Sequence, residues 1–442
     1  MSLKVYNSLT NKIEEFKTIK EKEVTMYVCG PTVYNYIHIG NARPVIFFDV
    51  FRRYLEFLGY KVTYASNITD VDDKIIAQAI KEHVSEKEIA SKYAEAFFND
   101  VKALNSKQCD FTPHATDYIP QMITFIQGLI DCGYAYEADG DVYFRVTKLN
   151  DYGVLSNQNT EQLESGARIK VNDKKENPLD FTLWKKTTEG IMWDSPFGKG
   201  RPGWHTECVC MIDDLFKGMI DVHGGGFDLK FPHHENEIAQ SEALHHHKIA
   251  NYYMHVGRVD LDGEKMSKSK GNVINIPFLQ EKGLLEAYRF LICFSHYRVQ
   301  VNFSLDLLEQ FKRDLDKIKR SFKQASLELD LADVSSNEVV ESDINSFISY
   351  MNDDFNTPNV LTLLLQITKD INVLLRSKDN TNLVLKVNTL KTIFDVFGLK
   401  LEYQKMNQET KQIYFDWNEA RINKDFAKAD LLRDKLVEKG VL

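Results

Sequence analysis

The chain has 442 residues, which is enough for several domains that each bury a hydrophobic core. Its hydrophobic content of 43% excludes a disordered chain, and 6 cysteines in this length exclude a small disulfide scaffold. The net charge of −9 argues against a surface that binds nucleic acid everywhere, although it does not exclude a local basic groove. No apolar stretch reaches the length of a membrane span and residues 1–16 lack a secretory signal, so we expect a soluble cytoplasmic protein with reduced thiols.

The first part of the chain has the pattern of a strand, a helix and a second strand. Val24–Val28 is typical of a short buried strand, and Val62–Tyr64 of the next one. Between them we predict a helix with Pro44 in its first turn and Gly59 at its end, supported by apolar residues at helical spacing: Phe47, Phe51, Leu55 and Leu58. A unit of this kind predicts a parallel sheet.

Further strands and many helices are predicted downstream. Helical patterns occupy residues 89–101 and 119–130, followed by a strand at Asp141–Val146. Asp151–Pro202, rich in Gly, Pro, Asn and Lys, is expected to be an irregular insertion, after which strands return at Met219–Val222 and Asn251–Val256. Beyond Leu284 the chain is expected to be helical, at residues 307–329, 344–352, 360–376 and 388–397 and in a tail helix around 427–436.

Two short motifs suggest nucleotide chemistry. His38-Ile39-Gly40-Asn41 lies between a predicted strand and a helix N-terminus, where free N–H groups and the helix dipole favour an anion. Lys265-Met266-Ser267-Lys268-Ser269 places two ammonium groups three residues apart in a predicted loop, which suits a clamp on a phosphate leaving group. Each motif alone is more often an ordinary turn or a solvated loop, whereas the pair around a βαβ unit is far more specific.

The pair resembles the HIGH and KMSKS signatures of class I aminoacyl-tRNA synthetases, with Asn41, which cannot titrate, in the last HIGH position. Longer stretches narrow the resemblance to the cysteinyl-tRNA synthetase family: Cys29–Tyr34, Asn67–Lys74, Gly203–Cys208, His223–Leu229 and Phe231–Glu237. The resemblance extends from about residue 2 to the end of the chain. It implies a Rossmann-like α/β core that activates cysteine with ATP, and a further small C-terminal segment that would follow Leu442.

A metal site is the next candidate. His233 and Glu237 are four residues apart and share one face of a helix, so both can bind one ion. With Cys29 and Cys208 they form a set of two thiolates, an imidazole and a carboxylate, which suits tetrahedral zinc. Spacing alone leaves buried structural cysteines as the simpler interpretation, and Cys210 as a competing ligand. The resemblance implies zinc at Cys29, Cys208, His233 and Glu237, where it would distinguish cysteine from serine.

The remaining site residues follow from the resemblance. It implies catalytic roles for His38, Asn41, Lys265 and Lys268, and ATP binding by His38, Gly40, Asn41, Gly225, Asp228 and Lys268. Gly224–Gly226 alone would more often be a turn. Thr32, Trp204, His205 and His255 are candidates for the amino-acid pocket, although a single aromatic residue or histidine is more often simply packed. The acidic run Asp70–Asp73 orients substrate groups or caps the following helix.

The expected organisation has six parts. They are residues 1–110, the first half of the catalytic domain; 111–202, a connective insertion; 203–255, its second half; 256–305, a stem-contact region with the KMSKS loop; 306–398, a helical bundle that contacts tRNA; and 399–442, a small anticodon-binding segment, whose truncation the sequence leaves open. The expected partners are L-cysteine, tRNA(Cys) and ATP with Mg²⁺, with one zinc ion per chain, no membrane, and a monomeric state.

Two other functions compete with this expectation. One is an amide-forming ligase that joins cysteine to an amino sugar, which would lack the helices after Leu305. The other is a catalytically silent RNA-binding relative, which the intact Lys265–Ser269 motif and the complete set of candidate metal ligands argue against.

Overall fold

The computed structural model describes residues 2–157, 174–266 and 271–441. The chain forms two compact units. The first unit contains Met1–Lys312, Tyr350–Pro358 and Val396–Gly398, and the second contains Arg313–Ser349, Asn359–Asp395 and Leu399–Leu442. Every predicted site residue that the structure describes belongs to the first unit.

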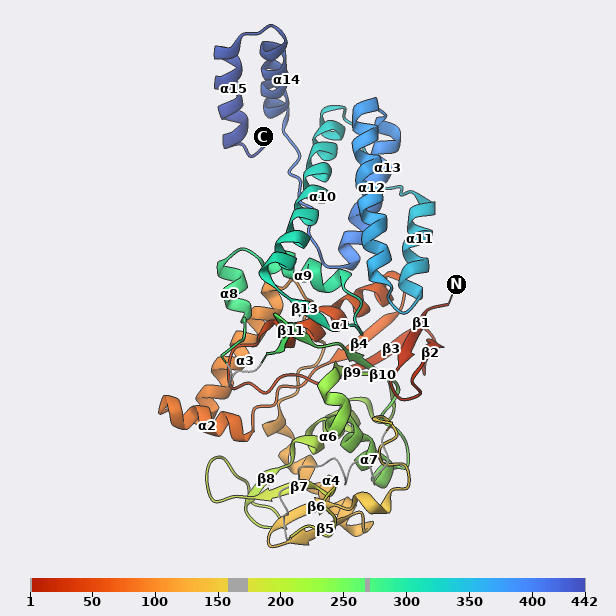
Figure 1. The fold of residues 1–442 in the computed structure, drawn as a ribbon, viewed down its shortest axis with the longest axis vertical. Coiled ribbons are helices and arrows are strands. Elements are labelled where there is room, and N and C mark those ends of the chain that lie inside the picture. Colours follow the sequence, from red (N-terminus) through yellow and green to blue (C-terminus); the bar gives the residue numbers. More distant parts are fainter. Residues whose placement is uncertain (1, 158–173, 267–270, 442) are drawn as a thin grey trace. The chain divides into compact units, whose positions relative to one another are not determined.

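A four-stranded sheet forms the centre of the first unit (Figure 1). Its order is β10-β9-β3-β4, and every neighbouring pair is parallel. The strands are β3 (Glu23–Val28), β4 (Lys61–Ala65), β9 (Ile220–Gly226) and β10 (Ala250–Val256). Helix α1 (Ile39–Phe57) lies between β3 and β4 in the chain, so the predicted βαβ unit is confirmed. The carboxyl ends of these strands meet at one edge, where ligands bind in open α/β sheets.

The two faces of the sheet pack against different helices because side chains alternate along each strand. Gly224 of β9 faces α1, where an added Cβ would lie 2.2 Å from the ring of Phe48. Tyr27 of β3 pairs with His223 of β9 on the opposite face. There the Tyr27 hydroxyl lies 3.3 Å from Met211 Sδ on α6 (Trp204–Phe216), and His223 contacts α7 (Glu235–His245). The sheet face beneath α6 and α7 therefore carries the titratable side chains of Tyr27 and His223.

Three local predictions need correction. Pro44 lies inside α1 rather than in its first turn, because the helix begins at Ile39 directly after the extended His38. Gly224–Gly226 forms the end of β9 rather than a turn, since these residues pair with β10. Cys210, which spacing alone left as a competing ligand, lies two residues from Cys208 on a helix, and such neighbours face in different directions.

The insertion between the halves of the sheet is more regular than predicted. Helix α4 (Ile119–Asp131) precedes a four-stranded antiparallel sheet made of β5 (Ala135–Ala138), β6 (Asp141–Phe144), β7 (Phe181–Lys186) and β8 (Gly200–Pro202). Two of these strands lie within the segment that was expected to be irregular. They form because Trp184 and Leu183 of β7 are fully buried in the core.

Smaller elements complete the first unit. The sheets are β1 (Lys4–Asn7) with β2 (Lys12–Glu15), and β12 (Glu264–Lys265) with β11 (Val259–Leu261) and β13 (Val301–Phe303). The helices are α2 (Asp73–Glu82), α3 (Glu86–Ala103), α8 (Ile276–Glu281) and α9 (Leu285–Phe294). Short helical turns are η1 (Ala115–Tyr118), η2 (Val146–Lys148), η3 (Phe227–Leu229) and η4 (Lys230–His234).

The C-terminal part of the chain is helical, as predicted. Its helices are α10 (Leu305–Leu331), α11 (Glu341–Asn352), α12 (Thr357–Ser377), α13 (Asn380–Val396), α14 (Gln408–Ile422) and α15 (Phe426–Glu438). The prediction missed α14 and began α13 at Asn388, eight residues late. Among the described residues, none of the helices combines the length and apolarity that a membrane crossing requires.

Candidate functional site

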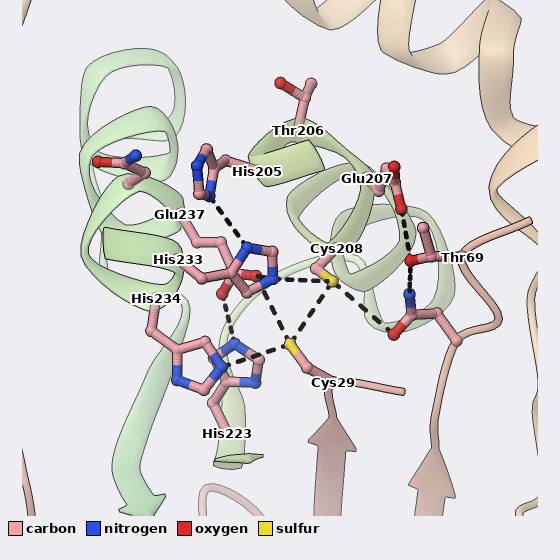
Figure 2. A network of polar contacts seen from close by, with 12 residues as sticks. Cys29, Thr69, His205, Thr206, Glu207, Cys208, His223, His233, His234 and Glu237 are labelled. Atoms are coloured by element: carbon pink, nitrogen blue, oxygen red, sulfur yellow. Dashed lines mark hydrogen bonds and ion pairs between the residues drawn. The ribbon is translucent and has the colours of Figure 1, made fainter. Parts of the chain in front are cut away.

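The four predicted metal ligands lie together at the carboxyl edge of the central sheet (Figure 2). Cys29 Sγ is 3.5 Å from Cys208 Sγ, and Cys208 Sγ is 3.7 Å from His233 Nε2. His233 Nε2 is 2.9 Å from Glu237 Oε1, which lies 3.7 Å from Cys29 Sγ. All four ligand atoms lie within 4.8 Å of one another, so this cluster could hold a metal ion.

The fold brings these four side chains together from distant parts of the sequence. Cys29 directly follows β3 and has the same parity as Tyr27, so it faces α6 and α7. Cys208 lies in the second turn of α6. His233 lies in η4, just before α7, and Glu237 lies in the first turn of α7. Cys29 alone of the four is partly exposed.

Two further histidines join the cluster, and neither was predicted to have a role. His223 Nε2 lies 2.5 Å from Glu237 Oε2, and His234 Nε2 lies 3.3 Å from Cys29 Sγ. With Cys29 and Glu237 they form a second group whose ligand atoms are close enough for one ion. The doublet His233-His234 was a visible signal, but the role of His223 depends on the strand parity of β9.

The charges in the cluster differ from those of free side chains. The hydrogen bond with Cys29 lowers the pKa of Cys208 to about 7, while burial raises the pKa of Cys29 well above its usual value. Burial opposes ionisation of Glu237, but the charges of His233, His223 and His234 hold its pKa well below the usual range. The cluster therefore contains a carboxylate and a thiol that ionises near neutral pH, as a divalent cation requires of its ligands.

A cleft of about 510 Å³ opens beside the cluster. The sequence-predicted residues that line it are Cys29, Thr32, His38, Gly40, Asn41, Trp204 and Asp228. Trp204 stacks on His233 with ring centroids 4.1 Å apart and links the cleft to the cluster. Gly225 lies in β9 beneath Leu229 and His234 and is not among the lining residues that the structure describes.

The signature residues form the start of α1. His38 is the N-cap residue, and its backbone N–H donates to Asn41 Oδ1 at 3.3 Å, so Asn41 helps to close the first turn. The next residue of the motif, Ile39, donates its backbone N–H to Ile274 O at 2.9 Å. Lys265 ends β12, and Lys268 lies outside the described residues.

The other two residues predicted for the amino-acid pocket, His205 and His255, lie behind the cluster rather than on the cleft. His205 Nδ1 is 3.0 Å from His233 Nδ1, and His255 Nε2 is 3.0 Å from His234 Nδ1. His255 also contacts Ser8 Oγ at 2.8 Å through Nδ1. Their contacts suit the orientation of the cluster histidines more than direct contact with a substrate.

The acidic run after β4 has mainly local partners. Asp72 caps α2 by accepting from Lys74 N–H at 2.8 Å. Asp73 pairs with Lys185 and Arg201 of the insertion, and Asp70 accepts from Thr116 N–H at 2.9 Å. The capping interpretation thus accounts for Asp72.

Two protein-family models together match most of the chain. The model of the class I (C) tRNA synthetase catalytic domain matches residues 15–313. The DALR domain model matches residues 346–402.

Curated proteins similar to the chain over its whole length carry one name. A cysteine–tRNA ligase of Acholeplasma laidlawii is 50% identical over 440 residues, which cover 100% of both chains. A cysteine–tRNA ligase of Anoxybacillus flavithermus is 46% identical and covers 100% of this chain, which in turn covers 97% of that protein.

Solved structures show the same fold at low identity. Methionyl-tRNA synthetase of Mycobacterium tuberculosis aligns with a TM-score of 0.61 at 15% identity, covering 92% of this chain and 96% of its own. The Agrobacterium radiobacter LeuRS complex aligns with a TM-score of 0.62 at 11% identity, covering 86% and 84%. The catalytic-domain model and the full-length relatives establish that the chain belongs to the cysteine–tRNA ligase family of class I tRNA synthetases.

Proposed function

We propose that the chain joins L-cysteine to tRNA(Cys) in two steps at the cleft beside the Cys29–Cys208–His233–Glu237 cluster. In the first step the cysteine carboxylate attacks the α-phosphorus of ATP, and pyrophosphate leaves. In the second step a ribose hydroxyl at the 3′ end of tRNA takes the acyl group, and AMP leaves. The observation that carries the proposal is the position of this cluster at the wall of a cleft that also contains His38 and Asn41.

The donor set fits zinc. Tetrahedral zinc with ligand distances of about 2.0–2.3 Å separates neighbouring ligand atoms by roughly 3.3–3.8 Å. Three of the ligand-to-ligand contacts, at 3.5, 3.7 and 3.7 Å, lie in this range, and the fourth, at 2.9 Å, is a hydrogen-bond distance. Bound there, zinc would supply a cation that prefers the sulfur of cysteine to the hydroxyl of serine.

The residues around the cleft bind and orient the substrates. Cys29, Thr32 and Trp204 line the cleft, which supports an amino-acid pocket next to the cluster. The N-terminus of α1 beside His38 carries a partial positive charge that favours the phosphates of ATP. Asp228 suits the ribose hydroxyls, since a carboxylate accepts two hydrogen bonds. The rate enhancement comes from positioning and electrostatics, without a covalent enzyme intermediate.

The family pattern supplies the remaining parts of the proposal. Lys265 and Lys268, with Mg²⁺, neutralise the charge that develops on the pyrophosphate. Residues 1–110 and 203–255 form the catalytic domain around the insertion 111–202, and residues 256–305 contact the tRNA stem. Residues 306–398 and 399–442 contact tRNA further from the 3′ end. We propose a monomeric cytoplasmic enzyme. The full-length similarity to cysteine–tRNA ligases supports a tRNA substrate over an amino sugar.

Replacing Cys208 tests the metal site and the activity together. Cys208→Ala removes one of four ligands, so we expect loss of bound zinc and a fall of at least about 100-fold in cysteine-dependent ATP–pyrophosphate exchange. Zinc content is measured by elemental analysis of the purified chain, and exchange is measured with cysteine and with serine.

Cys210→Ala is the matched control, because Cys210 is buried on the same helix but outside the cluster. This variant should keep its zinc and its preference for cysteine over serine. Normal zinc content and normal exchange in Cys208→Ala would contradict the proposed function.

A further inference from the structure

A chain of hydrogen bonds, two of them buried, connects the two cysteines of the cluster through three side chains that do not belong to it. The backbone N–H of Gly30, next to Cys29, donates to Asn67 Oδ1 at 2.8 Å. Asn67 Nδ2 donates to Thr69 Oγ1 at 3.1 Å. The Thr69 hydroxyl then donates to Glu207 Oε2, at 2.8 Å, and Glu207 precedes Cys208 on α6.

The three side chains are fixed in place. Asn67, Thr69 and Glu207 are each 1% exposed, so water does not compete for their hydrogen bonds. The direction of each hydrogen bond is defined, because the Thr69 hydroxyl accepts from the Asn67 amide and donates to the Glu207 carboxyl group. Figure 2 shows the Thr69 side chain directed at Glu207, which lies on the helix that carries Cys208.

The backbone around this chain is equally constrained. A Cβ on Gly30 would lie 1.7 Å from the carbonyl oxygen of Asn67, so the loops after β3 and β4 approach each other closely. The same two loops pair through Val33 N–H to Thr69 O and Thr69 N–H to Pro31 O, each at 3.2 Å. Thr69 is thus held by its backbone on the loop of Cys29, and its hydroxyl reaches the helix of Cys208.

We propose that Asn67, Thr69 and Glu207 are positioning residues that hold the Cys29 and Cys208 sulfurs at the separation a metal ion needs. The inference rests on the proposed metal site. The two ends of the hydrogen-bond chain lie next to the two ligands in sequence, and Asn67 Oδ1 also lies 3.8 Å from Cys208 Sγ. Cys29 and Cys208 are 179 residues apart in sequence. Without this hydrogen-bond chain, the loop of Cys29 and the helix of Cys208 lose one of the polar connections between them.

Thr69 gives the sharpest test because one hydroxyl makes both side-chain bonds. Thr69→Val keeps the shape of the side chain and removes the hydroxyl. Loss of such an outer partner lowers metal affinity by about 10–100-fold, and we expect this loss in the full-length chain. Zinc affinity is measured by competition with a chromophoric chelator. The cobalt-substituted protein reports ligand geometry through its visible absorption, independently of activity.

Two variants control for a general effect on the fold. Thr69→Ser restores the hydroxyl and should bind zinc within about threefold of the unaltered chain. Tyr54→Phe removes a buried hydroxyl that bonds Asn352 at 2.7 Å, and it should leave zinc affinity unchanged. Thr69→Ala, which introduces no new atoms, gives a second measurement if Thr69→Val is poorly soluble.

The outcomes separate this inference from the proposed function. Wild-type zinc affinity and an unchanged cobalt spectrum in both Thr69→Val and Thr69→Ala would overturn the inference and leave these residues a purely structural role. If Cys208→Ala loses zinc in the same assay, the proposed metal site stands although the inference fails. If Cys208→Ala keeps its zinc, the metal site itself is wrong.

Discussion

Asp100 places a carboxyl group in the interior, on helix α3, where its Oδ2 has no hydrogen-bond partner within the described residues. Burial raises the pKa of Asp100 to about 7. An acid whose pKa is higher in the folded state than in the unfolded state destabilises the fold as it ionises. The effect of Asp100 on the free energy of unfolding is therefore small near pH 4, and this free energy decreases as the pH rises towards 7.

This sign predicts that Asp100→Asn stabilises the chain only at higher pH. At pH 8 we expect a gain of about 2 kcal/mol in the free energy of unfolding, and at pH 4 a difference near zero. Urea unfolding of the first unit at pH 4, 6 and 8 measures it. Asp194→Asn, whose side chain is 85% exposed, should show no such pH dependence. A gain of equal size at every pH would contradict the prediction.

For single residues, the sequence predicted the four cluster ligands by their residue type but did not predict which histidines surround them. Cysteine, histidine and glutamate are ordinary zinc ligands, so Cys29, Cys208, His233 and Glu237 could be proposed from the amino-acid sequence and its family resemblance. His223 could not, because its position depends on the parity of β9 and on contact with α7. The positions of the partly buried His205 and the buried His255 behind the cluster also depend on tertiary contacts.

Arg43 connects secondary-structure elements within the first unit. Its guanidinium group is buried on α1 and donates to the carbonyl oxygens of Gly257 and Arg258, at 2.8 and 3.0 Å, and of His296, at 3.0 Å. Burial lowers the pKa of Arg43 to about 10, so it stays charged at neutral pH. Gly257 and Arg258 lie just before β11, and His296 lies in the loop between α9 and β13, so the side chain connects α1 to both segments.

Arg43→Met should therefore destabilise the first unit strongly. Three carbonyl groups lose the donor that the buried Arg43 side chain supplies, and we expect a loss of about 3–5 kcal/mol in the free energy of unfolding. Arg43→Lys keeps the charge without the planar fork and should lie between the two. Chemical unfolding gives the order, and amide exchange should become faster at Val259–Leu261. Equal stability of all three chains would show that these bonds contribute nothing.

Helices and strands whose apolar residues recur with a clear spacing were predicted well, whereas two short strands without such a spacing were missed. The apolar spacing of α1 and the buried strands on either side of it gave the βαβ unit. Strands β7 and β8 were missed because a short antiparallel strand within a Gly- and Pro-rich segment has little periodicity of its own. Their stability comes from the burial of Trp184 in the core, which spacing does not reveal.

At the scale of the whole molecule, the helical region was predicted, but its division between units was not. Tyr350–Pro358 and Val396–Gly398 belong to the first unit although they adjoin helices of the second. Such an assignment depends on contacts between distant segments. Arg289, for example, donates to Phe397 O at 2.8 Å and to Leu104 O at 2.8 Å. The boundaries of the six parts expected from the sequence remain predictions.

Phe426 allows the two proposed steps to be separated in the full-length chain. It begins α15, its side chain is 69% exposed, and it lies in the segment proposed to bind tRNA. An exposed aromatic ring offers a stacking surface worth about 1–3 kcal/mol per base. Phe426→Ala should therefore raise the KM for tRNA about tenfold or more in cysteinylation. Cysteine-dependent ATP–pyrophosphate exchange, which needs no tRNA, should not change.

The control for Phe426→Ala is Leu431→Ala on the same helix. Leu431 is 59% exposed, so its loss removes similar apolar surface without a ring on which a base can stack. This variant should keep the KM for tRNA. If the two variants behave alike, stacking at Phe426 does not contribute. If exchange falls together with cysteinylation in Phe426→Ala, the C-terminal segment acts on cysteine activation itself, and the proposed division of roles between catalysis and tRNA binding is wrong.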